Sequence, residues 1–408
     1  MSLEFVKLVD QVQKMGRFLG KRSQSVSSRL ELALQWFYAA EDLETVHQRI
    51  RLVRESSVSG YRGAAPAPLT PPEIIPATFP AAPAPANATI AAADGSQIYP
   101  DAHAPALYYL VNIGVYVYFH GHMRLPVQDT MPELCYSDSF LYDADGRLVN
   151  NQTVNARRSV AEVEALALLG EELGAEARPL IALHDGGLLK FFGSAEVAGA
   201  SAVLAAYMTA LRRLHDTGAV LAGYLDRPRS TYLISLLHLL SLEPDQITDA
   251  NLKTNGELEG LTDAHLYSHV LGPGERSAIM VQNSPQNHSY KQIAPEFEIA
   301  FFYLNLSDTR GPIIARVDIP MWVARSTAAV NDLQALLLAQ SAIQGRRRYP
   351  YAITRADELA YVSGTEKGQL NELLNIEMLR NEVSPEASNK LQTKGLSRGQ
   401  RQQHRIKR

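Results

Sequence analysis

The chain has 408 residues, of which 46% are hydrophobic and 20% are charged, and its formal net charge is −4. This composition is typical of a soluble globular protein of two or three units, and the charge excludes a protein that is basic over its whole surface. The one cysteine, Cys135, excludes an intrachain disulfide and a cysteine metal cluster. No apolar run reaches the ~18 residues that a membrane helix needs. We therefore expect a cytoplasmic protein without a membrane segment.

The first 60 residues carry apolar side chains at helical spacing over 3–18 and 24–54, which predicts two helices outside the main core. They would form either a lid packed on the protein or a docking element for a partner. Residues 61–88 form a Pro/Ala-rich linker, which can be neither a helix nor a central strand and is expected to be extended.

From residue 89 the pattern changes to alternating strands and helices, which predicts an α/β domain over 89–375. Its first part reads as three strands, a helix and a fourth strand, at 89–94, 106–119, 133–143, 156–173 and 178–187. Its later part predicts helices at 196–215, 230–241 and 327–344, a strand at 219–226, a strand-rich region around 279–319 and a last helix starting near Thr354.

Residues 376–408 are expected to form a basic, disordered tail. Within it, residues 389–408 contain seven Lys or Arg and no acid, and they show no apolar periodicity. The tail is either a solvated charged segment or a non-specific arm for polyanions such as nucleic acid.

Three acidic positions stand out by their placement. Asp94, in the stretch TIAAADGSQIYP, closes the first predicted strand, and Asp185 closes the fourth. The helix between them carries Glu162 and Glu164. Carboxylates from two strand ends and one helix can converge on Mg²⁺ or Mn²⁺, and two such ions can clamp a phosphodiester. Asp94 could also belong to an ordinary Asp-Gly turn.

Helical geometry separates the two glutamates, since residues two apart on a helix lie ~200° apart. Glu162 lies near the apolar stripe of the helix and is the better candidate, although either glutamate could be a solvated acid. Zinc is less favoured, because no His pair has a ligand spacing near these acids. His184 precedes Asp185, but strand alternation is expected to point it to the opposite face.

Six segments in order resemble the NurA nuclease family over roughly residues 85–370. They read DGSQIYPDAHAPALYYLVNIG, RRSVAEVEAL, LIALHDGGLL, LAGYLDRPRS, ARVDIPMWVA and RRRYPYAITRADELAYVS. The resemblance implies a ribonuclease-H-like mixed-sheet core with inserted helices, preceded here by the N-terminal helices and the Pro-rich linker.

The resemblance also implies a function. Family members are manganese-dependent DNA nucleases with 5′→3′ exonuclease and single-strand endonuclease activity, and Mg²⁺ is a possible alternative ion. They form homodimers and work with HerA, a hexameric DNA-translocating ATPase, in DNA end resection and repair. By the resemblance, Asp94 and Asp185 match the family's metal-binding aspartates, and the helical glutamate falls on Glu162 or Glu164.

The last motif departs from the family pattern. The resemblance assigns Tyr349 to positioning the phosphate or a metal-bound water, and it expects a His eight residues later, where this chain has Asp357. A carboxylate can still bind Mn²⁺ or Mg²⁺, but it cannot act as a neutral imidazole. Alternatively, Thr354 and Asp357 form a capping box at the start of a helix.

Four arginines are candidates for DNA binding. Arg157 and Arg158 lie one turn before Glu162 and could hold phosphates, although they could also be solvated. Arg347 and Arg348 directly precede Tyr349, and the alternative for them is an ordinary loop cluster.

Two other functions stay open. A non-catalytic adaptor that keeps the fold and docks a DNA-translocating ATPase is suggested by Asp357 in place of the His and by the Pro-rich insertion. A nuclease that acts on RNA is a weaker possibility, suggested by the ribonuclease-H-like core.

Overall fold

The computed structural model describes residues 4–55, 61–101, 104, 106–143, 146–174, 178–193, 197–308 and 311–383. They form two compact units, between which the chain passes repeatedly. No helix within these ranges is both long and apolar enough to cross a membrane. The first unit takes the residues up to Pro85, Asp185–Leu189 and Val220–Pro350, and the second takes Ala86–His184, Lys190–Ala219 and the residues from Tyr351 onward.

The second unit is built on a mixed sheet in the order β6-β3-β4-β5. β3 pairs antiparallel with β4 from Ala88 opposite His120 to Ile98 opposite Leu110. It pairs parallel with β6, which brings together strands far apart in the chain. The strands are β3 (Ala88–Ile98), β4 (Tyr109–His120), β5 (Val127–Cys135) and β6 (Leu180–Asp185).

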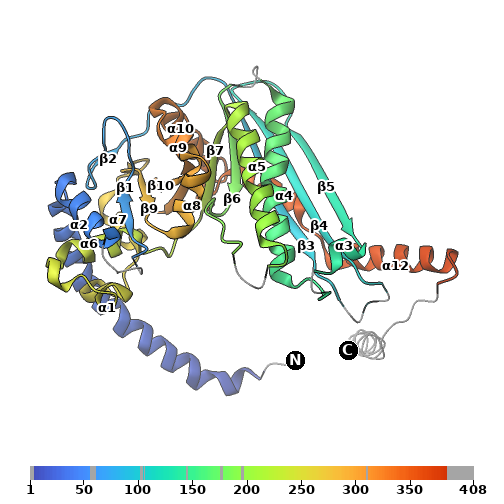
Figure 1. Cartoon of the computed structure of the whole chain (residues 1–408), viewed down its shortest axis with the longest axis horizontal. Helices are drawn as coiled ribbons and strands as arrows, with labels where there is room; N and C mark the ends of the chain where they lie inside the picture. The colour runs from blue at the N-terminus through green and yellow to red at the C-terminus, as the bar shows by residue number, and fades with distance from the viewer. Residues whose placement is uncertain are drawn as a thin grey trace, which may run out of the picture. The chain divides into compact units, whose positions relative to one another are not determined.

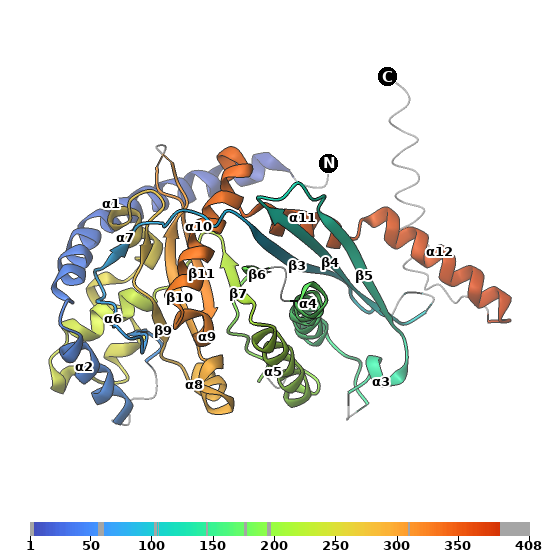
Figure 2. The same cartoon turned by 90° about the horizontal axis from the view of Figure 1, so that it is seen from above.

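Helices cover both faces of this sheet, which explains why β3 and β4 are rich in buried apolar residues. Figure 2 shows α4 (Asn151–Leu173) and α5 (Ala200–Thr217) on one side of the strands and α11 (Tyr351–Ala360) on the other. Asn150 caps the N-terminus of α4, because its side chain accepts a hydrogen bond from the Thr153 backbone N–H at 2.9 Å. A last helix, α12 (Gly364–Arg380), packs Leu370 and Leu374 against the sheet end near Ile98.

The first unit contains an antiparallel sheet in the order β1-β9-β10-β11-β7, with β2 and β8 beside it (Figure 1). All seven residues of β10 are buried, so this strand forms the centre of the core. The strands are β1 (Ala64–Pro66), β2 (Thr78–Phe79), β7 (Val220–Leu225), β8 (Arg276–Ser277), β9 (Met280–Gln282), β10 (Ile299–Asn305) and β11 (Ile314–Pro320). The helices are α1 (Val9–Ala39), α2 (Leu43–Glu55), α6 (Tyr232–Ser241), α7 (Asp263–Val270), α8 (Pro285–Ile293), α9 (Met321–Ala324) and α10 (Thr327–Ile343).

A buried carboxylate ties this core together. Asp263 accepts hydrogen bonds from the backbone N–H groups of Tyr232 and Ile234 at the start of α6, and from the Tyr303 hydroxyl at 2.6 Å. Burial raises the pKa of Asp263 to about 6, while these hydrogen bonds oppose the shift. Asp263 therefore caps α6 although it lies far away in the chain.

Two predicted strands differ from the observed ones. β3 continues four residues past Asp94, because Gly95–Ile98 remain paired with β4, so Asp94 neither ends a strand nor lies in a turn. The predicted strand 133–143 is wrong after Cys135, where a short helix, α3 (Asp138–Leu141), follows Ser137 at its N-cap position.

The predicted break between two N-terminal helices, at residues 18–24, is wrong. One helix, α1, runs through the expected break between residues 18 and 24, and the chain turns only after Ala39. The residues of the expected break include no proline, which explains why the helix continues. Phe37 is fully buried and meets the Tyr267 ring edge-on at 5.9 Å, so the end of α1 belongs to the core.

The Pro/Ala-rich segment is extended, as predicted, but it is more than a connector. It supplies β1 at the edge of the sheet, where proline is tolerated. Glu73 accepts hydrogen bonds from both terminal nitrogens of the buried Arg276 and from the Ile279 backbone. At the other end of the chain, α12 extends to Arg380, so the predicted tail boundary at 376 is wrong, and residues 384–408 lie outside the described residues.

We predict that Gly114→Ala destabilises the second unit by about 1–3 kcal/mol. A Cβ at residue 114 would lie 2.4 Å from the Ala356 carbonyl and the Ala360 nitrogen of α11, so the helix would have to move. Urea unfolding should show this loss. The matched control is Gly368→Ala in α12, where a Cβ meets nothing within 4 Å. The control should be neutral or stabilising, and equal effects of the two changes would contradict the proposed close packing.

Candidate functional site

Asp94 lies on the face of the sheet that α11 covers. Its register partner on β4 is Gly114, against which α11 packs. Ser96, two residues after Asp94 and on the same face of β3, donates its hydroxyl to the Ala360 carbonyl of α11 at 2.5 Å. The Asp94 carboxylate accepts a hydrogen bond from the Gly95 N–H at 2.8 Å. The side chain is therefore held by its own strand.

Asp94 and Asp185 each come one residue after a pair of facing residues on β3 and β6. Ala93 of β3 is the parallel register partner of His184 of β6, and Asp94 and Asp185 are the next residues along the two strands. The chain passes from the second unit to the first between His184 and Asp185.

Glu162 reaches β3 from the opposite face, on α4. Its side chain is only 3% exposed, which confirms the prediction that this glutamate faces the sheet. A Cβ at Gly95 would lie 2.8 Å from Glu162 Oε1, so only glycine leaves room for this carboxylate. Gly95 thus allows a buried carboxylate to approach the strand at the residue that follows Asp94. Glu164 is half-buried and lies elsewhere on α4.

Two basic side chains face the Glu162 carboxylate. Arg158 Nε lies 3.2 Å from Oε1, and His184 Nδ1 lies 3.6 Å from Oε2. Arg158 also donates through Nη1 to the Gly95 carbonyl and to Gln97 Oε1. The guanidinium therefore compensates a charge that would be costly to bury alone.

His184 is fully buried, and burial lowers its pKa well below the usual range, with further lowering by the positive charges of Lys190 and Arg158. The ring is therefore neutral at physiological pH. Neither of its nitrogens makes a hydrogen bond with a residue that the structure describes. The expectation that His184 points to the face opposite Asp185 stays a prediction, and on the face that His184 occupies, α4 brings the Glu162 carboxylate to it.

In the first unit, Tyr349 and Asp185 are brought together. The Tyr349 hydroxyl donates to Asp185 Oδ1 at 2.7 Å across 164 residues of chain. The Tyr349 ring packs edge-on against the Tyr224 ring, with centroids 5.0 Å apart. Tyr224 is buried, and its pKa is raised by burial and by the nearby charges of Asp226 and Asp185.

Asp357 is exposed on α11. This helix begins at Tyr351, so Thr354 lies within its first turns and does not cap it. The capping-box explanation of Asp357 is therefore wrong, and its role as a metal ligand stays a prediction.

The four arginines predicted to bind DNA have different surroundings. Arg157 donates to the Tyr109 hydroxyl and the Phe140 carbonyl, and Arg158 is engaged with Glu162. Arg348 pairs with Asp308. The Arg347 side chain is exposed and makes no bond with any residue in the described ranges.

A hard divalent ion requires several oxygen ligands gathered at one place. Among the described residues, no three His, Cys, Asp or Glu side chains form a ready metal cluster. The groups that would hold an ion are nevertheless of the right kind, since Asp94, Glu162 and Asp185 offer carboxylate oxygens. Nδ1 of the neutral His184 lies 3.6 Å from Glu162 Oε2, a position from which a neighbouring ring orients a carboxylate ligand. The residues therefore fit Mn²⁺ or Mg²⁺ by chemistry.

Sequence reasoning missed Gly95 and the contacts of Arg158 and His184 with Glu162. The spacing of Arg158 and Glu162, four residues apart on one helix, is a signal that could have revealed their pairing. The other two contacts depend on how α4 lies against β3 and β6.

Comparison with known proteins places the chain among its relatives. The family model described as the NurA domain matches residues 88–362. The structure is similar to the crystal structure of the NurA nuclease from Sulfolobus solfataricus, with a TM-score of 0.52 and 12% identity over 92% of this chain and 97% of that one. It also matches the catalytic domain of human endonuclease V, with a TM-score of 0.32 and 13% identity over 81% and 95% of the two chains. No curated protein matches the sequence.

The first of these similarities extends over nearly the whole of both chains and shows a shared fold, which is the ribonuclease-H-like mixed sheet expected from the sequence. The domain match spans most of the chain, from the first residue of β3 to just beyond α11. This protein belongs to the NurA family.

Proposed function

We propose that this chain is a divalent-metal-dependent deoxyribonuclease. The observation that carries the proposal is the buried Glu162 carboxylate, which α4 brings against Gly95 of β3, the residue that follows Asp94. A buried carboxylate is costly for stability, and such costs are typical of functional sites. The family membership and the nuclease named in the structural match support the same conclusion.

In this proposal, Asp94, Glu162 and Asp185 hold Mn²⁺, or Mg²⁺ in its place, and Asp357 contributes a further oxygen. Because Asp94 and Glu162 lie on opposite faces of β3, a shared ion would require one of these two side chains to move towards the other. The bound ion would activate water and stabilise the leaving oxygen of the phosphodiester. The chain's own side chains position these ligands. Tyr349 fixes the Asp185 carboxylate through its hydroxyl, and Arg158 neutralises Glu162.

The finer features follow from the family resemblance. We propose 5′→3′ exonuclease and single-strand endonuclease activity, a homodimer, and a role in DNA end resection and repair with a HerA-like ATPase. Of the arginines proposed to bind DNA, Arg347 is the most available for phosphate, because Arg157, Arg158 and Arg348 already contact protein partners.

Asp94→Asn should lower cleavage of end-labelled single- and double-stranded DNA by more than about 100-fold in Mn²⁺ or Mg²⁺, because a ligand charge is lost. EDTA should abolish cleavage by the wild type. Asp129→Asn is the matched control, since Asp129 also accepts from the next backbone N–H at 2.8 Å but is exposed on β5.

Equal activity of the two variants would contradict the nuclease site. No cleavage by the wild type in any metal, together with binding of a HerA-like ATPase, would support the adaptor instead. Cleavage confined to RNA or hybrid substrates would favour the RNA nuclease.

Arg158 is a cation that already faces the Glu162 carboxylate. Because Arg158 competes with a metal ion for this carboxylate, Arg158→Gln should raise Mn²⁺ affinity several-fold, on the order of one kcal/mol. Without metal, the same change should destabilise the protein by about 1–3 kcal/mol, since a buried carboxylate loses its partner. Isothermal titration with Mn²⁺ and thermal unfolding with and without Mn²⁺ measure both effects.

Arg213→Gln is the control for this prediction, because Arg213 pairs with Glu171 through two hydrogen bonds on the same helix pair. It should leave Mn²⁺ affinity unchanged. A weaker Mn²⁺ affinity in Arg158→Gln would show that Arg158 does not compete for the ion.

Tyr349 has two contacts that can be tested apart: its hydroxyl positions Asp185, and its ring packs against Tyr224. Tyr349→Phe keeps the ring against Tyr224 but removes the hydroxyl bond to Asp185. We expect kcat to fall about 10–100-fold with stability within about 1 kcal/mol of the wild type. Tyr361→Phe, at an exposed tyrosine, should change neither quantity. A Tyr349→Phe enzyme with wild-type kcat would exclude the positioning role.

A further inference from the structure

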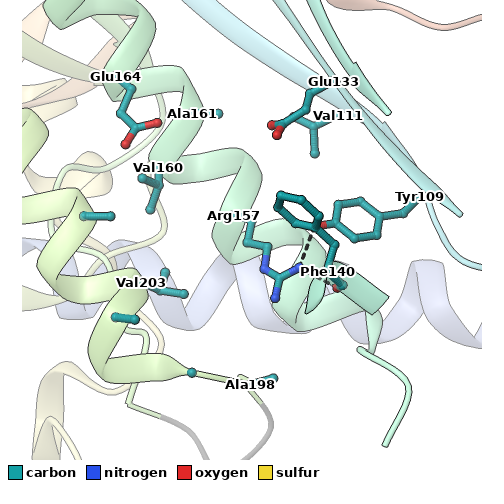
Figure 3. A pocket seen from close by; sticks show the side chains of 13 residues that line it. Tyr109, Val111, Glu133, Phe140, Arg157, Val160, Ala161, Glu164, Ala198 and Val203 are labelled. Carbon is teal, nitrogen blue, oxygen red and sulfur yellow. Dashed lines mark hydrogen bonds between the residues drawn. The ribbon is translucent and has the colours of Figure 1, made fainter. Parts of the chain in front are cut away.

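A pocket of about 330 Å³ lies within the second unit, away from Glu162 and Asp94. Figure 3 shows it between α4, α5 and the strands β4 and β5, with α3 at one end. This volume lies within the range of small-molecule sites. The residues that line it are Tyr109, Val111, Glu133, Phe140, Arg157, Val160, Ala161, Glu164, Ala198, Gly199, Ala202, Val203 and Ala206.

Small side chains create the hollow. α5 presents Ala202 and Ala206 to the pocket, and α4 presents Ala161. Val111, Phe140, Val160 and Val203 add apolar surface to the wall, and Val160 and Val203 are nearly fully buried. Since α4 and α5 pack against each other, larger residues at these alanines would fill the space between the helices and the sheet.

The cationic side chain of Arg157, which has protein partners, lies at one end of the pocket. Arg157 Nη1 donates to the Tyr109 hydroxyl at 2.5 Å and to the Phe140 carbonyl at 2.7 Å, as the dashed lines of Figure 3 show. Neither Nε nor Nη2 of this guanidinium bonds to any residue in the described part of the chain. This end therefore offers donors and disfavours a second positive charge.

The other end carries two carboxylates. Glu164 and Glu133 face each other across the pocket (Figure 3). Burial raises the pKa of Glu164, Arg213 opposes this, and the charge of Glu133 raises it further. Arg213 itself donates to Glu171. Among the described residues, no side chain forms a hydrogen bond or an ion pair with Glu133 or Glu164.

We propose that this pocket binds a small organic monocation, in which one ammonium group is carried by an apolar, ring-sized body. The ammonium would lie between Glu133 and Glu164, and the apolar body would contact Val160, Val203 and Phe140. A water molecule takes up about 30 Å³, so the volume suits a ligand of roughly ten non-hydrogen atoms. Arg157 at the far end favours a neutral acceptor there, such as a hydroxyl, and excludes a polyamine.

Phenethylamine and tyramine are suitable probes, with phenethyl alcohol and 3-phenylpropionate as uncharged and anionic counterparts of similar size. Isothermal titration of the full chain should give amine Kd values on the order of 0.1–1 mM. The alcohol should bind about 10-fold more weakly, and the anion should not bind measurably. Equal binding of amine and alcohol, or no amine binding at about 10 mM, would overturn the proposal.

Variants identify the site and its charge. Glu164→Gln should weaken amine binding about 10-fold, whereas Glu172→Gln, at an exposed glutamate of the same helix, should not. Ala202→Leu should block the pocket and abolish binding of every probe. Glu133→Gln is a second charge variant at an exposed position, useful if Glu164→Gln unfolds. Unchanged amine affinity in folded Glu164→Gln and Ala202→Leu proteins would place the binding elsewhere.

Discussion

The contact of the buried Glu162 carboxylate with β3 is the interaction on which the second unit depends. Placing a carboxylate at 3% exposure inside a sheet–helix interface requires compensation, and three features provide it. Arg158, one turn earlier on α4, supplies the opposite charge. Gly95 supplies space, and the neutral His184 supplies a polar neighbour. Loss of Gly95 would leave a clash, and loss of Arg158 would leave an uncompensated charge, so the packing of α4 on β3 depends on both residues.

The two faces of the β3–β4 pair are packed by different helices, each at a glycine. Glycine at 95 lets α4 approach with a carboxylate, and glycine at 114, opposite Asp94, lets α11 approach with its backbone. Because successive residues of a strand point to opposite faces, Asp94 and the Glu162 contact occupy neighbouring positions on opposite sides of β3. A rigid central strand, paired on both edges, thereby brings two carboxylates to one short stretch of backbone.

In the first unit, buried polar groups also join segments that are distant in the chain. Asp263 caps α6 and accepts from Tyr303, and Glu73 binds Arg276 from a segment that reads as a linker. These bonds explain how a Pro-rich stretch becomes part of a core, since its carboxylate satisfies a buried guanidinium that would otherwise be costly.

The sequence by itself determined the order and type of most elements of the α/β core, the family resemblance and the choice of Glu162, because helical and strand periodicities are local properties of the chain. It misjudged where β3 and α1 end, since pairing with β4 and packing of Phe37 decide these ends. Only the tertiary structure decided the surroundings of Glu162, the bond between Tyr349 and Asp185 and the pocket beside Arg157. Each of these joins residues from different elements, and their contacts depend on distances that no local pattern encodes.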